Sequence, residues 1–163
     1  MAKRQVDPHT GEGLCVVCPT YDERDHVFPL VRGLFDILPR AQVLFVDDAS
    51  PDGTGQRIEE LSRQDVRVHA LHRPGKRGLG TAYVEGFQWA LARPFAAIAE
   101  MDADLSHDPR DLARMLAALA DGADLVIGSR AVPGGAIPGW GPARHLLSKD
   151  GSAYESLILG RHE

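Results

Sequence analysis

The sequence contains very little cysteine and no long apolar run. Only two of its 163 residues are cysteines, Cys15 and Cys18, which excludes a fold held together by several disulfide bonds. No uninterrupted apolar stretch reaches the roughly 18 residues that a membrane-spanning helix needs. Residues 1–13 contain Lys3 and Arg4 but lack the apolar segment of a secretory signal, so we expect them to form a flexible N-terminal tail.

Positive charge is also in short supply. The chain has 18 lysines and arginines against 23 aspartates and glutamates, a formal net charge of −5. A domain that binds nucleic acid is normally basic, so the composition argues against nucleic acid as a partner. Small anionic ligands are not excluded, because local charges and divalent cations can override the net value.

The two cysteines have the C-x-x-C spacing of half a zinc site. They lie in the apolar run 14–18, which we interpret as a strand, and on a strand positions i and i+3 point to opposite faces. No second cysteine or histidine pair follows nearby to complete four ligands. We therefore predict two buried thiols in a reducing cytosol rather than metal ligands.

Apolar patterns typical of strands and helices alternate along the chain. Strands are predicted at 14–19, 42–46, 66–71, 95–101 and 124–127. Helices are predicted at 27–38, around 58–61, at 79–91, at 112–119 and at 143–159. This alternation predicts right-handed βαβ units and an α/β fold, a three-layer sandwich with a mostly parallel central sheet. We expect a single domain over residues 14–163.

Polar clusters follow four of the five predicted strands. In a parallel sheet, ligands bind beyond the carboxyl ends of the strands, so we expect these clusters to converge on one cleft. The clusters are residues 19–23, 47–48, 102–104 and 128–130. The glycine patterns of a dinucleotide site, a P-loop and a hydrolase nucleophile elbow are all missing.

Asp102 and Asp104 lie two residues apart in an extended segment, so both carboxylates can face one side. Such hard oxygen ligands suit Mg²⁺ or Mn²⁺, which completes its shell with water and substrate phosphates. The alternative is that the two aspartates only cap the following helix. A second acidic pair, Asp47 and Asp48, favours the cation, because carboxylates at adjacent strand ends repel each other unless a cation or ribose hydroxyls lie between them.

Five segments together resemble the family-2 glycosyltransferases of the GT-A fold, and among them the polyprenol- and dolichol-phosphate mannose synthases. In chain order they are PTYDE, VDDASPDGT, RGLGTAYVEGF, MDADLSHDP and IGSR, within a match from Leu14 to about Gly160. The resemblance implies a sugar-nucleotide donor, GDP-mannose in that branch, and a polyprenyl or dolichyl phosphate acceptor. It also implies a metal-dependent mannosyltransferase that uses Mg²⁺ or Mn²⁺.

The resemblance implies roles for individual residues of this chain. The donor would be bound by Pro19, Tyr21, Glu23, Val46, Asp48, Asp102, Ala103, Asp104 and Arg130. The metal would be held by Asp102, Asp104 and Ser106. The acceptor phosphate would be held by Arg130, Arg144 and Ser148, of which the last two share a helix face. Asp104 and Arg130 would be the catalytic residues.

A phosphate monoester is already mostly an anion at neutral pH, since its second pKa is about 6. It can attack the anomeric carbon in line without a protein base, so we predict inversion there. His107, beside the D-x-D segment, is not needed as a base. The acceptor is a membrane lipid, so we expect a cytoplasmic protein with peripheral contact to the cytoplasmic membrane face. The apolar stripe of the predicted helix 143–159 fits either the lipid surface or the sheet.

The sequence departs from the family pattern at Asp22, Ala131 and Asp150, and it ends at Glu163. Family members continue with a D-x-T-x-G-F-R-like segment and an acceptor-side helix, so the domain is expected to lack its C-terminal acceptor-side part. Two alternatives therefore stay open. One is a truncated or non-catalytic domain that binds a nucleotide sugar. The other is the same fold using another donor, such as UDP-glucose.

Overall fold

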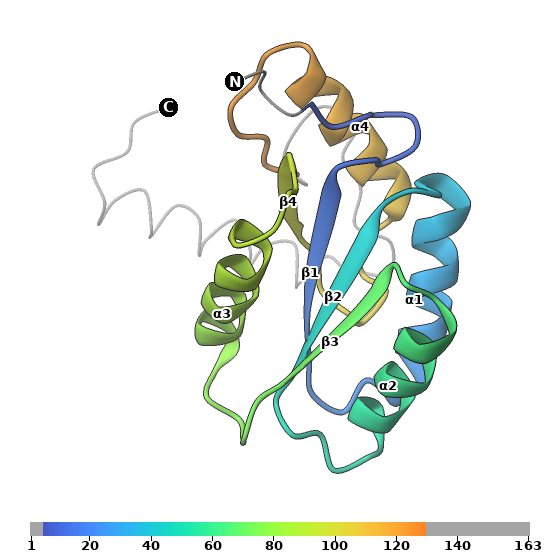
Figure 1. The fold of residues 1–163 in the computed structure, drawn as a ribbon, viewed down its shortest axis with the longest axis vertical. Helices are drawn as coiled ribbons and strands as arrows, with labels where there is room; N and C mark the ends of the chain where they lie inside the picture. The colour runs from blue at the N-terminus through green and yellow to red at the C-terminus, as the bar shows by residue number, and fades with distance from the viewer. Residues whose placement is uncertain (1–4, 130–163) are drawn as a thin grey trace, which may run out of the picture. The chain divides into compact units, whose positions relative to one another are not determined.

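The computed structural model describes residues 5–129 (Figure 1). The chain divides after Ile127 into two units, and every element named below belongs to the first. The predicted loop 131–142, the predicted helix 143–159, and Arg130, Arg144 and Ser148 lie outside the described residues.

The core of the fold is a sheet of four parallel strands in the order β3-β2-β1-β4. The strands are β1 (Leu14–Thr20), β2 (Gln42–Asp47), β3 (Val68–His72) and β4 (Ala97–Glu100). In the β1–β2 ladder, Cys15 pairs with Gln42 and Thr20 with Asp47. Since all four strands run the same way, their carboxyl ends lie at one edge of the sheet, which we call the carboxyl edge.

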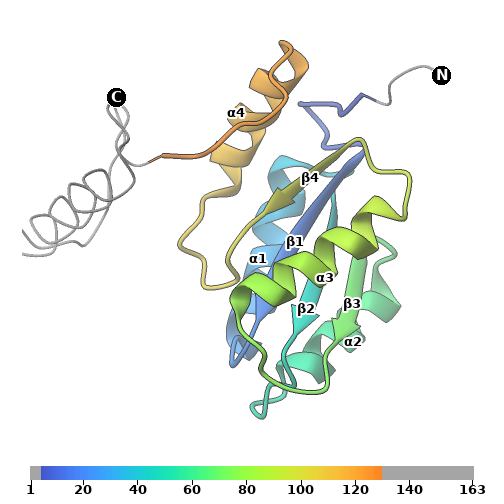
Figure 2. The same cartoon turned by 90° about the vertical axis from the view of Figure 1, so that its left-hand side faces the viewer.

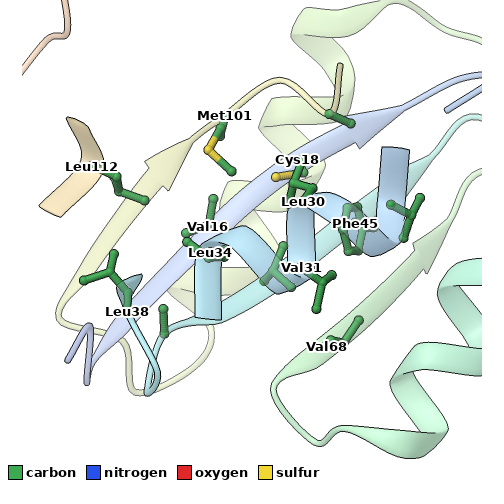
Figure 3. Close-up of a cluster of buried hydrophobic side chains, with 14 of the residues drawn as sticks. Val16, Cys18, Leu30, Val31, Leu34, Leu38, Phe45, Val68, Met101 and Leu112 are labelled. Atoms are coloured by element: carbon green, nitrogen blue, oxygen red, sulfur yellow. The ribbon is translucent and has the colours of Figure 1, made fainter. Parts of the chain in front are cut away.

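Helices cover both faces of the sheet and complete three layers, as predicted (Figures 1 and 2). They are α1 (Arg24–Ile37), α2 (Thr54–Gln64), α3 (Leu79–Leu91) and α4 (Pro109–Ala120). One apolar cluster joins α1, α2 and α4 to the sheet, with Val16, Leu34 and Phe45 among its fully buried members (Figure 3). A second cluster joins α3 to the opposite face through Val17, Val46 and Ala82.

The two cysteines lie on opposite faces of β1, as predicted from their spacing. Cys18 belongs to the cluster under α1, α2 and α4, and Cys15 to the cluster under α3. Both are free and fully buried, and burial raises the pKa of the Cys15 thiol to about 12. They are core residues and do not form half of a metal site.

The prediction of a fifth strand at 124–127 is wrong. The structure has no strand there, and the side chains of Leu125 and Ile127 are about three-quarters exposed. A strand exists only where a neighbour supplies ladder hydrogen bonds, and within residues 5–129 β4 pairs with β1 alone. The segment 124–127 has the apolar pattern of a strand but pairs with no strand of residues 5–129.

Residues 1–13 were expected to form a flexible tail, but residues 5–13, the part of this segment that the structure describes, are folded against the rest of the domain. Gly11 N–H donates to Asp7 O, Arg40 N–H donates to Thr10 O, and Arg40 pairs with Glu12 at 2.6 Å. Gly11 has a φ of +73°, and a Cβ there would lie 2.9 Å from the Cβ of Ala41. Such a turn is set by a glycine and by distant partners rather than by apolar periodicity.

Candidate functional site

The loops that leave the carboxyl edge share an unusual backbone. Each of the loops after β1, β2 and β4 contains one non-glycine residue with a positive φ, namely Asp22 (62°), Ala49 (57°) and Leu105 (63°). A backbone of this kind is uncommon outside glycine and clusters at functional sites, where the surrounding structure holds it in place. The same three loops carry most of the residues assigned to the site from the sequence that the structure describes, namely Tyr21, Glu23, Asp48, Asp102, Ala103, Asp104 and Ser106.

Asp47 and Asp48 are adjacent, but their carboxylates have different hydrogen-bond partners. Asp47 is buried and accepts hydrogen bonds from the Ser50 hydroxyl at 2.6 Å and from the Thr20 hydroxyl at 3.3 Å. It therefore braces the loop after β2 against the end of β1. Asp48 is also buried, but it contacts Arg73 and the backbone N–H of Arg77. The pair is thus not one cation-attracting cluster, because each carboxylate has its own protein donors.

Arg73, which sequence reasoning missed, lies at the centre of this part of the site. Its side chain is fully buried, Nη1 lies 2.5 Å from Asp48 Oδ1, and Nη2 donates to the hydroxyl of Thr81. Its Nε is 3.3 Å from a Glu85 oxygen but makes no hydrogen bond within residues 5–129. The sequence did offer a clue to Arg73. Four of the five predicted strands were followed by polar residues assigned to the site, and Arg73 follows the remaining one, strand 66–71.

The segment after β4 holds the two aspartates of the D-x-D motif in different surroundings. Met101 and Ala103 pack into the core, while Asp102 and Asp104 are not buried. Asp102 Oδ1 accepts a hydrogen bond from the Tyr83 hydroxyl at 3.1 Å. The backbone N–H of Asp102 donates to His107 Nδ1 at 3.3 Å, so His107 is engaged with the D-x-D segment.

Asp104 remains available as a charged ligand. Its Oδ1 accepts the backbone N–H of Ser106 at 2.9 Å, and the hydrogen bonds from Ser106 lower the pKa of the Asp104 carboxyl below its ordinary value. The alternative that the D-x-D aspartates cap the next helix does not hold, because the N-cap of α4 is Asp108, which accepts from Arg110 N–H at 2.9 Å.

The residues after β1 lie beside the β2 loop. The Tyr21 ring is partly exposed and carries the Lys76 ammonium 3.7 Å from its centre. Glu23 N–H donates to the Thr54 hydroxyl at 2.9 Å, and the Glu23 carboxylate bonds His26 Nδ1 at 2.5 Å. The Lys76 ammonium is thus attracted to one face of the Tyr21 ring by a cation–π contact.

Pro19 and Val46 are paired neighbours in the β1–β2 ladder. The side chain of Val46 is fully buried beneath α3, so any ligand contact at this position would use the backbone. Pro19 is only partly buried and lies one residue before the end of β1.

The donor set fits a divalent cation that shares its shell with a substrate. No group of three or more histidine, cysteine, aspartate or glutamate side chains in residues 5–129 could hold a metal ion alone. Asp102 and Asp104 supply hard oxygen ligands, and Ser106 is already bonded to Asp104. Mg²⁺ and Mn²⁺ are commonly held in this way, by one or two carboxylates together with substrate phosphates and water.

The helices of residues 5–129 include none that is long and apolar enough to cross a membrane.

Several curated proteins resemble this chain along most of its length. The polyprenol monophosphomannose synthase of Mycolicibacterium smegmatis is 47% identical over 146 residues, 89% of this chain and 55% of that protein. The undecaprenyl-phosphate mannosyltransferase of Micrococcus luteus is 49% identical over 145 residues, 88% of this chain and 59% of that protein. The dolichol-phosphate mannosyltransferase of Pyrococcus furiosus is 36% identical over 148 residues, 90% of this chain and 40% of that protein. The chain thus spans between two and three fifths of the length of these relatives.

A solved structure shares the fold. The mannosyltransferase PcManGT from Pyrobaculum calidifontis, in complex with GDP-Man and Mn²⁺, superposes with a TM-score of 0.57 at 23% identity, covering 72% of this chain and 35% of that one. The family model for glycosyl transferase family 2 matches residues 15–161. The resemblance carried by the five sequence motifs is therefore confirmed, and the chain belongs to glycosyl transferase family 2.

Proposed function

We propose that this chain is a metal-dependent, inverting glycosyltransferase that moves mannose from GDP-mannose to a polyprenyl phosphate. The observation that carries the proposal is the arrangement of Asp48, Asp102 and Asp104 at the ends of β2 and β4, the two strands that flank β1. Two relatives at 47% and 49% identity are named as transferring mannose to polyprenyl phosphates, and a structure of the same fold holds GDP-Man and Mn²⁺.

The donor nucleoside would lie over the ends of β1 and β2. Tyr21 offers a partly exposed ring, Glu23 a carboxylate at the start of α1, and Asp48 a carboxylate held by Arg73. Carboxylates of this kind accept hydrogen bonds from ribose hydroxyls and base N–H groups. Pro19 and Val46 would contribute the adjoining backbone.

The diphosphate would lie over the end of β4. Asp102 and Asp104 would hold Mg²⁺ or Mn²⁺, with the Ser106 hydroxyl beside them and Ala103 lining the backbone. When bound, the cation supplies charge stabilisation for the departing diphosphate. Asp104 suits this role because its hydrogen bonds with Ser106 favour the carboxylate form.

The acceptor needs no proton removed by the protein. Its phosphate monoester is mostly an anion at neutral pH and attacks the anomeric carbon opposite the leaving group, which inverts that centre. His107 accepts a hydrogen bond from Asp102 N–H, consistent with a supporting role rather than that of a base. Arg130, Arg144 and Ser148 are proposed to hold the acceptor phosphate, and transfer is proposed to take place at the cytoplasmic face of the membrane.

Transfer of radiolabelled mannose from GDP-mannose to a short polyprenyl phosphate tests the proposal, with Mn²⁺, with Mg²⁺ and with a chelator. We expect a metal-dependent product whose anomeric configuration is opposite to that of the donor. UDP-glucose supplied in parallel tests the alternative donor. Binding of GDP with Mn²⁺ but without any product would instead support a donor-binding domain that does not turn over.

A further inference from the structure

The side chain of Tyr83 joins helix α3 to the D-x-D segment. The Tyr83 hydroxyl donates to Asp102 Oδ1 at 3.1 Å, although the two residues are 19 positions apart and belong to different elements. In a βαβ unit the helix runs antiparallel to the strands, so the first half of α3, which contains Tyr83, lies at the carboxyl edge (Figure 2). The fold therefore places the Tyr83 hydroxyl within hydrogen-bonding distance of Asp102.

The position of Tyr83 depends on a close approach between α3 and the sheet. Gly86 faces β1 and β2, and a Cβ at this position would clash with Val17 and lie 3.2 Å from a methyl group of Val46. Since α3 packs over β1 through a glycine, the side chains one turn earlier are held close to the strand ends. The Tyr83 ring is also fixed from its own helix, with its centre 5.9 Å from that of Phe87.

The hydroxyl of Tyr83 is a permanent donor. Its oxygen lies within hydrogen-bonding distance of a carboxylate, which in its ionised form can only accept, so the phenol is the donor of this bond. One oxygen of Asp102 is thus engaged by Tyr83, while Oδ2 lies 3.8 Å from His107 Nε2. A hydrogen bond to one carboxylate oxygen fixes the rotation of the group and the direction of the other oxygen.

We propose that Tyr83 is a positioning residue for the metal and diphosphate site, holding Asp102 through its hydroxyl so that the second carboxylate oxygen faces the ligand. The inference rests on the proposed function, because it assigns Asp102 to that site. Tyr83 acts through Asp102 and does not itself touch the donor.

Tyr83→Phe in the full chain tests the proposal, because it removes the hydroxyl and keeps the ring. The affinity for GDP is measured by calorimetry with and without Mn²⁺, and the melting temperature is measured in parallel. We expect the gain in GDP affinity that Mn²⁺ provides to fall about tenfold, the effect of losing one hydrogen bond to a charged group. The affinity for GDP without metal should stay within about twofold of the parent value.

Phe87→Leu is the matched control, since it disturbs the packing of the Tyr83 ring and leaves the hydroxyl in place. It should lower the melting temperature and preserve the Mn²⁺-dependent gain. The Tyr83–Asp102 contact can also be followed without any ligand, by NMR of the chain labelled with ¹³C-tyrosine. The phenolic carbon signal that disappears in Tyr83→Phe belongs to Tyr83, and Asp102→Asn should shift that signal.

Two results would overturn the inference: a Tyr83→Phe variant that keeps the full Mn²⁺-dependent gain, or one that loses GDP affinity equally with and without metal. If the parent chain shows no Mn²⁺-dependent GDP binding at all, the proposed function fails and the inference fails with it. The tyrosine signal distinguishes these cases, because it reports the Tyr83–Asp102 contact whether or not GDP binds.

Discussion

Arg73 and Asp48 form a buried ion pair at the carboxyl edge, with Nη1 of the arginine 2.5 Å from Oδ1 of the aspartate. The same guanidinium donates to Thr81 in the first turn of α3. Charges taken out of water are tolerated only when they are paired and hydrogen-bonded. The position of Asp48, a residue proposed to bind the donor, therefore depends on Arg73.

Arg73→Lys should destabilise the fold and weaken donor binding together. Lysine keeps the charge but lacks the planar fork that reaches Asp48 and Thr81 at once. We expect the free energy of unfolding to fall by about 1–3 kcal/mol, measured by urea denaturation, with weaker GDP binding by calorimetry. Arg110→Lys is the control, because Arg110 forms a similar pair with Asp108 on the surface. Equal stability of the two variants would contradict a special role for Arg73.

Gly86→Ala should also destabilise the fold, because the added methyl group meets Val17 and Val46 where α3 crosses the sheet. Overpacking of this kind costs about 1–3 kcal/mol, measured by urea denaturation. Gly80→Ala in the same helix is the control, since nothing lies within 4 Å of its Cβ position. Val17→Ala makes room, so Gly86→Ala should cost less in that background; a full cost there would mean that another contact is responsible.

Asp104→Asn should remove metal-dependent transfer while leaving the fold intact. The amide oxygen still accepts from Ser106 N–H but no longer offers a charged ligand. We expect the rate of mannose transfer to drop by about 100-fold or more, measured with radiolabelled donor across a range of Mn²⁺ concentrations. Asp111→Asn, on the exposed face of α4, should behave as the parent. An Asp104→Asn variant with an unchanged rate and metal requirement would end the assignment of Asp104.

Asp65 should contribute stability that depends on pH. Hydrogen bonds from Arg67 hold the pKa of the Asp65 carboxyl below its ordinary value of 3.8. A pKa that is lower in the folded chain adds stability above the unfolded pKa, and this stability is lost as the pH falls through the folded pKa. The stability difference between the parent and Asp65→Asn, measured by urea denaturation, should be full at about pH 6 and shrink below about pH 4. A difference that grows on acidification would contradict this sign.

The local patterns of the sequence predicted the four helices of residues 5–129 and four of the five strands. Helix α3 was predicted at 79–91 and occupies Leu79–Leu91, because helical hydrogen bonds are formed within one segment. Strand 124–127 was predicted from an equally apolar run and is not formed, because a strand needs a neighbour that its own residues cannot supply. The folded segment around Gly11 was missed for a related reason, since its partners are at residues 40 and 41.

From the sequence alone we could predict the α/β layers, the parallel sheet, the placement of Asp48, Asp102 and Asp104 at strand ends, and membership of the family. These follow from local periodicity, from the rule that parallel strands end at one edge, and from five ordered motifs. The contacts of each carboxylate became known from the folded structure: Arg73 for Asp48, Ser106 for Asp104, and Tyr83 for Asp102. Two of these three partners lie 25 and 19 residues away from their aspartates. Arg73 meets Asp48 because β3 pairs with β2, and Tyr83 meets Asp102 because α3 packs on the sheet. No local pattern encodes either relationship.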